Sequence, residues 1–433
     1  MRQFTFLILV LFYLPVFGAS EVLPNYLSFE DAVKLTLDKN SDLSAIRSQE
    51  EALKLRSKQA LAPNNPVFSY TANDTPGFSP AIQPAETVYQ INFTLGFPGK
   101  ALAQSANLRH QAEVSQEQAI AKEIDLIISL SNNYVSFSNN DTFYHLLKDE
   151  EQRSEKLLRL LEKKMASGQA AKVDLLNAKV VTAQIQQDLL ANRNEYEVLT
   201  TQFRQIIRKP ERVDLFPKIP KEIVVPSLKK NFDELSRLML KNQHSLLAAQ
   251  HQVEASQSAL TLASLQPLPD LQLMTALNIW NSGAGSPIPG VTRDYAFGIG
   301  VSVPLFFPFN ELTGIKAAEK DLSNADYQVE SQRLSSIANL QTLYTSLKAS
   351  QTETENLSKI VVPAAKASYD LMLLTYSLGR ADFFRLNDSR KSWFDSQRQL
   401  LAKKQEAAQL FNSFIQGVGC DFTKNEGPHA CIE

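Results

Sequence analysis

Two long segments of the chain carry apolar residues at helical spacing within polar sequence. From Lys100 to Met165 no proline occurs, and Ile120, Ile124 and Ile127 recur three or four positions apart, as on one face of a helix. At about 1.5 Å per residue, such a helix is on the order of 100 Å long, and its many charges exclude a span through lipid. The pattern predicts a long helix in water that neighbouring helices stabilise.

A second long helix is expected from Glu311 to Leu378, with a local kink at Pro363 because proline lacks the backbone donor that a helix interior needs. The two long helices end at Gly168 and Gly379, and a further helix returns after each. Apolar residues in the returning segments follow heptad-like spacing, from Ile185 to Ile206 and from Trp393 to Val418. This spacing predicts coiled-coil packing near the glycine turns.

Four shorter segments alternate bulky apolar residues with small or polar ones. They are Val67–Ala72, Tyr89–Phe97, Leu271–Ile279 and Phe297–Leu305. The alternation fits membrane barrel strands and also a half-buried sheet in water. Two hairpins cannot close a membrane barrel, because single-chain barrels begin at about eight strands. In the membrane case several chains must therefore share one barrel, and the Gly-, Pro- and Ser-rich loops 73–85 and 281–293 would face the cell exterior.

The chain contains an internal duplication. The segment Phe29–Leu37 recurs as Phe232–Leu240, and the correspondence continues to Leu43 and Leu246. Each copy begins a unit of helix, two strands, long helix and return helix. The expected divisions are a signal peptide at 1–20, a first repeat at 21–208, a proline-rich linker at 209–230, a second repeat at 231–419 and a tail at 420–433.

The composition and the two ends of the chain limit the classes of function that the protein can have. A net charge of −2 and a pI near 6.3 give no reason to expect a nucleic-acid partner. An apolar run from Phe4 to Phe17 before small residues predicts export by a signal peptide, and no cysteine follows to carry a lipid anchor. The only cysteines, Cys420 and Cys431, are expected to form a disulfide, with a metal site that includes His429 as the alternative.

The sequence gives no sign of an enzyme or of a cofactor. No nucleophile–base arrangement or phosphate-binding loop occurs. No metal-ligand spacing on one helical turn is found among the histidines, which are His110, His145, His244, His251 and His429. His244 and His251 could share a helix face, where, without a carboxylate or thiolate partner, a solvated or interface role is expected. No catalytic, cofactor or metal residue is predicted.

Taken together, these motifs resemble the TolC-type outer-membrane factors. The resemblance rests on the duplicated opening helix (here Leu27 to Leu43), the strand pairs and the turns Ser167–Ala170 and Leu378–Ala381. It implies a mainly α homotrimer in the outer membrane of a Gram-negative-type envelope. Four strands per chain would form a twelve-stranded β-barrel, and long coiled-coil helices would form an α-barrel across the periplasm.

The resemblance also implies partners and a passive role. A TolC-type duct works with a periplasmic adaptor and an inner-membrane pump, here expected to be of the RND type. Pro63–Pro66, Phe97–Lys100 and Asn310 with Gly314 look most like the CzcC-type heavy-metal branch. The alternatives are drug or dye efflux, type I secretion, or, in a different class, a structural coiled-coil spacer of the envelope with a soluble sheet.

Two sites follow from the resemblance alone. Adaptor docking is expected at the turn residues Gly168, Gln169, Gly379 and Arg380. A periplasmic gate is expected at Asp174, Tyr376, Arg380, Asp382, Arg385 and Asp388. Arg385 stands where the family has an acidic residue, and Ala381 where it has the gate arginine, so the charge of the gate departs from the family's pattern. We expect Asp174 to pair with Arg385.

Overall fold

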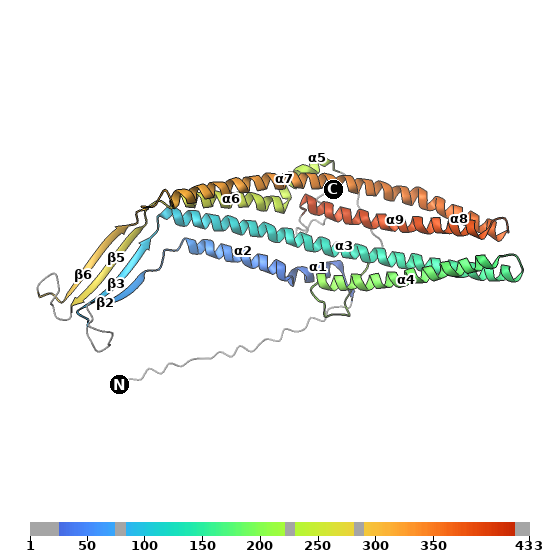
Figure 1. Cartoon of the computed structure of the whole chain (residues 1–433), viewed down its shortest axis with the longest axis horizontal. Coiled ribbons are helices and arrows are strands. Elements are labelled where there is room, and N and C mark those ends of the chain that lie inside the picture. The colour runs from blue at the N-terminus through green and yellow to red at the C-terminus, as the bar shows by residue number, and fades with distance from the viewer. Residues whose placement is uncertain (1–25, 74–83, 221–229, 281–289, 421–433) are drawn as a thin grey trace, which may run out of the picture.

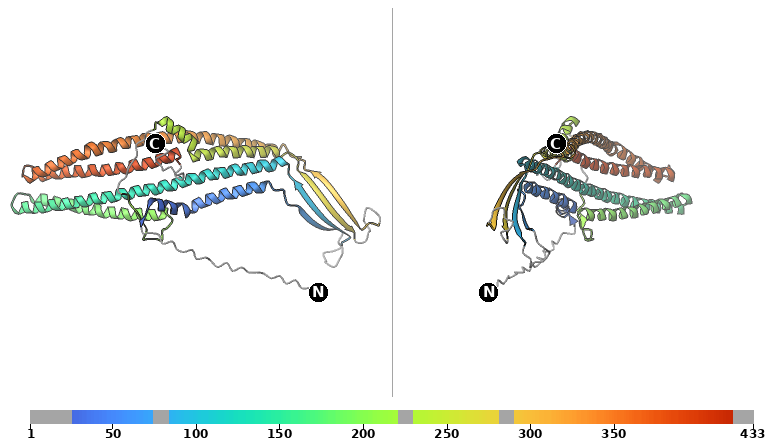
Figure 2. Two further views of the ribbon diagram at one scale, coloured as in Figure 1. Left: turned by 180° about the vertical axis from the view of Figure 1, so that it is seen from behind. Right: turned by 60° about the vertical axis from the view of Figure 1, so that its left-hand side comes forward.

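The computed structural model describes residues 26–73, 84–220, 230–280 and 290–420. The molecule is a rod of long helices with a four-stranded sheet at one end (Figures 1 and 2). Its longest element is α3 (Pro98–Ala166), with 69 residues, as the proline-free segment predicts. The expected signal peptide lies outside the described residues. No helix in the described ranges is long and apolar enough to cross a membrane.

The same order of elements occurs twice along the chain. The first set is α1 (Phe29–Asp38), α2 (Ser41–Ala60), β2 (Val67–Asn73), β3 (Glu86–Leu95), α3 and α4 (Lys172–Ile206). The second set is α5 (Phe232–Asn242), α6 (His244–Leu265), β5 (Leu271–Trp280), β6 (Arg293–Val301), α7 (Glu311–Asn356), the π-helical turn η1 (Leu357–Val361), α8 (Val362–Ser377) and α9 (Phe383–Val418).

The opening helix of each set begins at a side-chain cap and then breaks. Ser28 accepts from the backbone N–H of Asp31 at 3.2 Å, and Asn231 accepts from that of Glu234 at 2.9 Å, which satisfies a free donor of each first turn. The prediction of one helix from Leu27 to Leu43 was wrong. Asn40 caps a new helix there by accepting from two backbone N–H groups at 3.0 Å.

The second long helix is interrupted where Pro363 predicts a kink. The turn Leu357–Val361 is π-helical, and α8 resumes with Pro363 in its first turn. Proline cannot donate to the carbonyl four residues before it and clashes with that carbonyl. The wider π turn accommodates this missing hydrogen bond.

The four strands form one antiparallel sheet in the order β2-β3-β5-β6. Pairing of β3 with β5 joins the two halves of the chain. The fourth strand ends at Val301 rather than at the expected Leu305. Ser302 and Asp270 close the ladder by two hydrogen bonds, at 2.8 and 3.1 Å, and the following Pro304 has no N–H to continue it.

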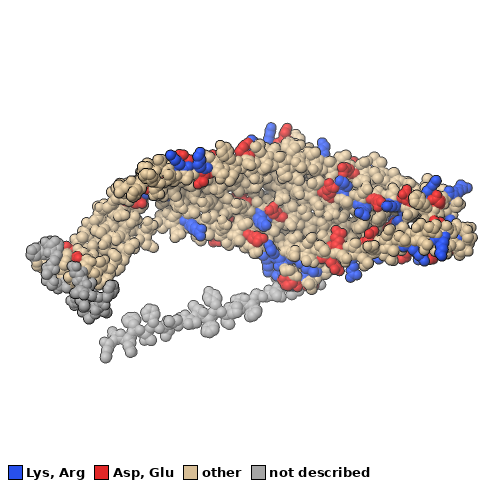
Figure 3. Space-filling model, in the orientation of Figure 1, with Lys and Arg blue, Asp and Glu red and all other residues tan. Residues whose placement is uncertain are grey.

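The register places most of the bulky apolar residues of the four strands on one face of the sheet, while Met274 and Trp280 lie on the other. Cross-strand neighbours on the apolar face include Tyr70, Tyr89, Leu277 and Tyr295, and also Phe68, Ile91, Thr275 and Phe297. The opposite face carries rows such as Ser69, Gln90, Ala276 and Ala296. Phe297 is 82% exposed and Ile299 79%, so the chain by itself leaves this apolar face uncovered. Lys, Arg, Asp and Glu gather over the helices rather than the sheet (Figure 3).

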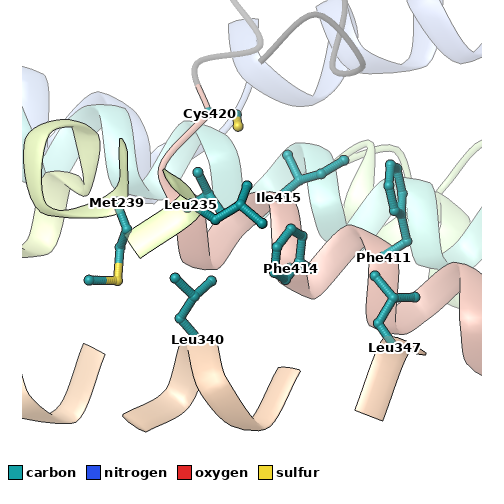
Figure 4. Close-up of a cluster of buried hydrophobic side chains, with 9 residues drawn as sticks. Leu235, Met239, Leu340, Leu347, Phe411, Phe414, Ile415 and Cys420 are labelled. Carbon is teal, nitrogen blue, oxygen red and sulfur yellow. The ribbon is translucent and has the colours of Figure 1, made fainter. Parts of the chain in front are cut away.

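Two cores fix the middle of the rod, one in each half. In the first half, Ala32 of α1 packs with Leu130 and Phe137 of α3 and Phe203 of α4. In the second half, the duplicated position Leu235 of α5 packs with Leu340, Phe411 and Phe414 of α7 and α9 (Figure 4). Part of the expected linker is ordered, because β4 (Phe216–Pro217) pairs in parallel with β1 (Tyr26–Leu27).

Candidate functional site

The far end of the rod consists of two helical hairpins that turn at glycines. Gly168 and Gly379 adopt left-handed φ angles of 75° and 73°, which residues with a Cβ rarely adopt. The next residues close matching turns: Gln169 N–H donates to the Lys164 carbonyl at 2.8 Å, and Arg380 N–H to the Thr375 carbonyl at 3.0 Å. Both glycines are exposed. The four predicted docking residues thus occupy equivalent positions on two similar turns.

Tyr376 lies inside the chain near these turns. Its side chain is buried and packs edge-on against Phe383 at a centroid distance of 6.4 Å. The ammonium group of Lys164 lies 4.4 Å from the Tyr376 ring centroid and donates to the Tyr376 carbonyl at 2.9 Å. Burial, and next the charge of Asp174, raise the pKa of the Tyr376 hydroxyl. Tyr376 therefore connects the α3–α4 hairpin to the α8–α9 hairpin.

The charged gate candidates lie on the surface of the same end. Asp382 caps α9 by accepting from the backbone N–H of Arg385 at 2.8 Å, and the two side chains lie 3.6 Å apart. Asp388 and Arg380 are exposed. Among the described residues of one chain, the expected Asp174–Arg385 ion pair is not formed, because Arg385 faces Asp382 on its own helix. The pairing of Asp174 with Arg385 across adjacent helices stays a prediction.

A buried ion pair that the sequence analysis missed joins α3 to α9. Glu150 is 1% exposed, and it pairs with Arg390, which is 7% exposed. A second guanidinium, that of Arg153, lies 3.4 Å from Glu150 and stacks 4.5 Å from the centroid of Trp393. The sequence feature that could have predicted this pair is a charge at a heptad position, because Arg390 lies between Leu386 and Trp393 at 4-3 spacing.

Comparison with known proteins agrees with this architecture. The family model described as outer membrane efflux protein matches residues 235–419. The second half of the chain is therefore similar to the outer membrane efflux proteins. No curated protein sequence matches the chain significantly.

The solved structures show that the TolC-type fold extends over both halves. The outer-membrane channel OprN matches with 18% identity and a TM-score of 0.75, covering 90% of this chain and 89% of its own. VceC of Vibrio cholerae matches with 17% identity and a TM-score of 0.75 over 91% and 96%. CmeC of Campylobacter jejuni, an outer membrane channel, matches with 13% identity and a TM-score of 0.74 over 93% and 87%.

Two histidines have carboxylate partners that lie on another helix. His244 lies 2.7 Å from Glu117, and His251 lies 3.5 Å from Glu113. Both histidines belong to α6 and face carboxylates of α3. The expected interface role is thus observed, but the statement that they lack carboxylate partners was wrong. The spacing along α6 could not show carboxylates that come from another helix.

Of the two cysteines in the predicted disulfide, Cys420 lies in the described part of the chain and Cys431 does not. Cys420 is 2% exposed, belongs to the core around Phe414 and is disulfide-bonded. Cys431 and His429 lie outside the described residues, so the predicted pairing with Cys431 stays a prediction.

Proposed function

We propose that three copies of this chain assemble into a passive outer-membrane exit duct. The observation that carries the proposal is the uncovered apolar face of a four-stranded sheet whose outer strands, β2 and β6, have unpaired edges within the chain. Open edges are not tolerated in lipid. Three sheets joined edge to edge would form a twelve-stranded barrel with its apolar face toward lipid, while the helices extend into the periplasm.

The polar face of the sheet would then line the duct. It carries Gln90, Asn92 and Gln272 together with small residues such as Gly298 and Gly300. Small polar side chains leave space for water, and the same face carries the carboxylates of Glu86 and Asp294 near the ends of β3 and β6. A passive duct of this kind depends on a pump for direction and energy.

The glycine turns are proposed to dock a periplasmic adaptor, which connects the duct to an inner-membrane pump of the RND type. The two turns repeat the same backbone geometry on adjacent hairpins, so a trimer would present six similar turns at its periplasmic end. An adaptor with a repeated binding unit could engage both kinds of turn.

The gate is proposed to lie at the same end, where Asp174 of one chain pairs with Arg385 of another. An exposed ion pair contributes at most about 1 kcal/mol, so a docking partner could open it. Single-channel conductance in planar bilayers tests this proposal: Arg385→Ala should conduct better than wild type. An Arg385→Ala channel that conducts no better would contradict the gate without affecting the duct.

Heavy-metal cations are the proposed cargo, on the basis of the CzcC-like segments Pro63–Pro66 and Phe97–Lys100. Growth of a deletion strain on a panel of divalent metals, dyes and detergents, with a plasmid copy as the control, tests this proposal. We expect selective sensitivity to zinc, cobalt, cadmium or copper that the plasmid reverses. Sensitivity confined to dyes and detergents would overturn the metal cargo and assign the duct to drug efflux. An unaltered strain whose protein is absent from outer-membrane trimers would favour the structural spacer.

A further inference from the structure

Four side chains with metal-binding groups meet at the interface of α3 and α6. His110 and Glu113 lie one turn apart on α3, and His251 and Glu254 lie one turn apart on α6. We call these four residues the His–Glu cluster. Each histidine Nδ1 approaches both carboxylates: His110 lies 2.8 Å from Glu113 and 3.2 Å from Glu254, and His251 lies 3.5 Å from Glu113 and 2.8 Å from Glu254.

The arrangement has the size of a four-ligand metal site. All four ligand atoms lie within 4.8 Å of one another. Around a zinc ion with bonds of about 2.1 Å, neighbouring tetrahedral ligand atoms are about 3.4 Å apart. The cluster's contacts, from 2.8 to 3.5 Å, bracket this separation. Side-chain rotations that move the shorter pairs apart by about 0.6 Å would open a space for the ion.

We propose that the His–Glu cluster binds a divalent transition-metal ion, with Zn²⁺ as the best fit. Two carboxylates balance the charge of the ion, and two neutral imidazoles complete a nitrogen and oxygen set that suits zinc. Mg²⁺ and Ca²⁺ favour all-oxygen sites. The histidine side chains are 19% and 30% exposed, which gives an ion access from water.

Neighbouring contacts hold the cluster in place. Arg109 lies 4.0 Å from the other oxygen of Glu113, Oε1, which leaves Oε2 directed toward the histidines. On either side along the interface, Asn107 donates to the Ala255 carbonyl at 2.7 Å and His244 lies 2.7 Å from Glu117. The two helices are therefore fixed beyond both ends of the cluster, and an ion would meet ligands that are already close to position.

The site would link the two halves of the duplicated chain. The α3 ligands belong to the first set of elements and the α6 ligands to the second, and no backbone hydrogen bond joins these helices. An ion that binds only the folded arrangement stabilises it by mass action. This role does not depend on which solute passes through the duct, so the site can be present whether or not the proposed cargo is correct.

The same contacts also permit a simpler role, in which two histidine–carboxylate pairs bridge the helices without an ion. Replacement of the carboxylates by amides separates the two cases. In Glu113→Gln and Glu254→Gln the amide oxygen still accepts from a histidine Nδ1–H, but it lacks the negative charge that a metal ligand needs. The variants should therefore fold as wild type and bind zinc poorly.

The experiment measures Zn²⁺ binding to the full chain, purified in detergent and stripped with chelator, by calorimetry and by the shift in Tm. We expect wild type to bind zinc and to unfold several degrees higher with it, and Mg²⁺ to have no effect. The double variant Glu113→Gln/Glu254→Gln should lose at least about tenfold in affinity, the lower limit for disturbing ligand surroundings. His145→Ala is the matched control, since His145 lies on α3 and is 73% exposed; it should bind as wild type.

An anomalous-scattering peak at the zinc edge, between His110 and His251 in zinc-soaked wild-type crystals, would support the site without any substitution. Wild type that takes up no zinc, or a double glutamine variant that binds zinc as tightly as wild type, would overturn the proposal. Neither result concerns channel conductance, so failure here is distinguishable from failure of the proposed duct.

Discussion

At the residue scale, the most constrained charge in the described chain is Glu150. It is enclosed between α3 and α9, where Arg390 compensates it and Arg153 adds a second guanidinium. Burial of a charge carries a large desolvation cost that a partner must offset. The pair therefore holds the two hairpins in one relative register, because a sliding of α9 along α3 would separate the charges.

Removal of Arg390 should strongly destabilise the chain. We expect Arg390→Ala to lower the free energy of unfolding by about 3–5 kcal/mol, since it leaves Glu150 buried and unpaired. Urea unfolding monitored by circular dichroism measures the change. Arg385→Ala is the control, and as an exposed substitution it should change stability by no more than about 0.5 kcal/mol.

A second variant tests whether the unpaired charge of Glu150 causes the loss of stability. In Glu150→Gln/Arg390→Met both charges are absent, so much of the lost stability should return. If the double variant is as unstable as Arg390→Ala, packing rather than charge explains the loss.

At the scale of elements, the sheet divides its residues between two environments. Phe297 lies on the apolar face and Gln272 on the opposite face, on neighbouring strands. We expect Phe297→Lys to impair membrane insertion, because a lysine at mid-depth on the lipid face costs about 2–4 kcal/mol. The fraction of chain in outer-membrane trimers measures the effect.

Gln272→Lys is the matched substitution on the polar face. It should insert at wild-type levels and change only the ion selectivity of the channel, since it faces water in the proposed duct. Equal insertion defects in both variants would contradict the assignment of the two faces.

The hairpin turns give a different prediction, because they contribute little to packing. Apart from the adjacent residues of the chain, no atom lies within 4 Å of a Cβ built on Gly168 or Gly379, but their positive φ angles disfavour other residues. We expect Gly168→Val and Gly379→Val to leave the trimer intact and to reduce cross-linking to an adaptor. Loss of the trimer itself would contradict the docking role.

At the scale of the whole molecule, one chain is incomplete. Its sheet has two open edges and one apolar face, and most of its charges lie on the helices (Figure 3). Open strand edges and an exposed apolar face would favour aggregation of a monomer. If three copies close into a barrel, the edges pair with one another and the apolar face contacts lipid.

The purified chain should therefore be a trimer that resists SDS until it is heated. Light scattering in detergent should give three chains per particle, and boiling should shift the gel band to one chain. The other candidate, a structural spacer with a sheet in water, needs no trimer. A monomer recovered from the soluble fraction would contradict the duct.

Local patterns by themselves determined the elements of this protein. The proline-free run predicts α3, and the repeat of Phe29 at Phe232 predicts the doubled order of elements. The alternation predicts β5 to within one residue, but β3 begins three residues earlier and ends two residues earlier than predicted. These features depend on the spacing of residues close in sequence, so the chain itself specifies them. The broken opening helix was missed because the cap at Asn40 acts over only three residues within an apolar pattern.

Only the tertiary structure decided which distant residues meet. Glu150 pairs with Arg390, 240 positions later, and His110 with Glu113 meets His251 with Glu254. Each histidine–glutamate pair is visible in the sequence at i, i+3 spacing, but the face that each pair presents depends on how α3 and α6 pack. Pairing across helices is a property of that packing and not of local spacing, so a metal site shared between the two halves could be found only in the folded chain.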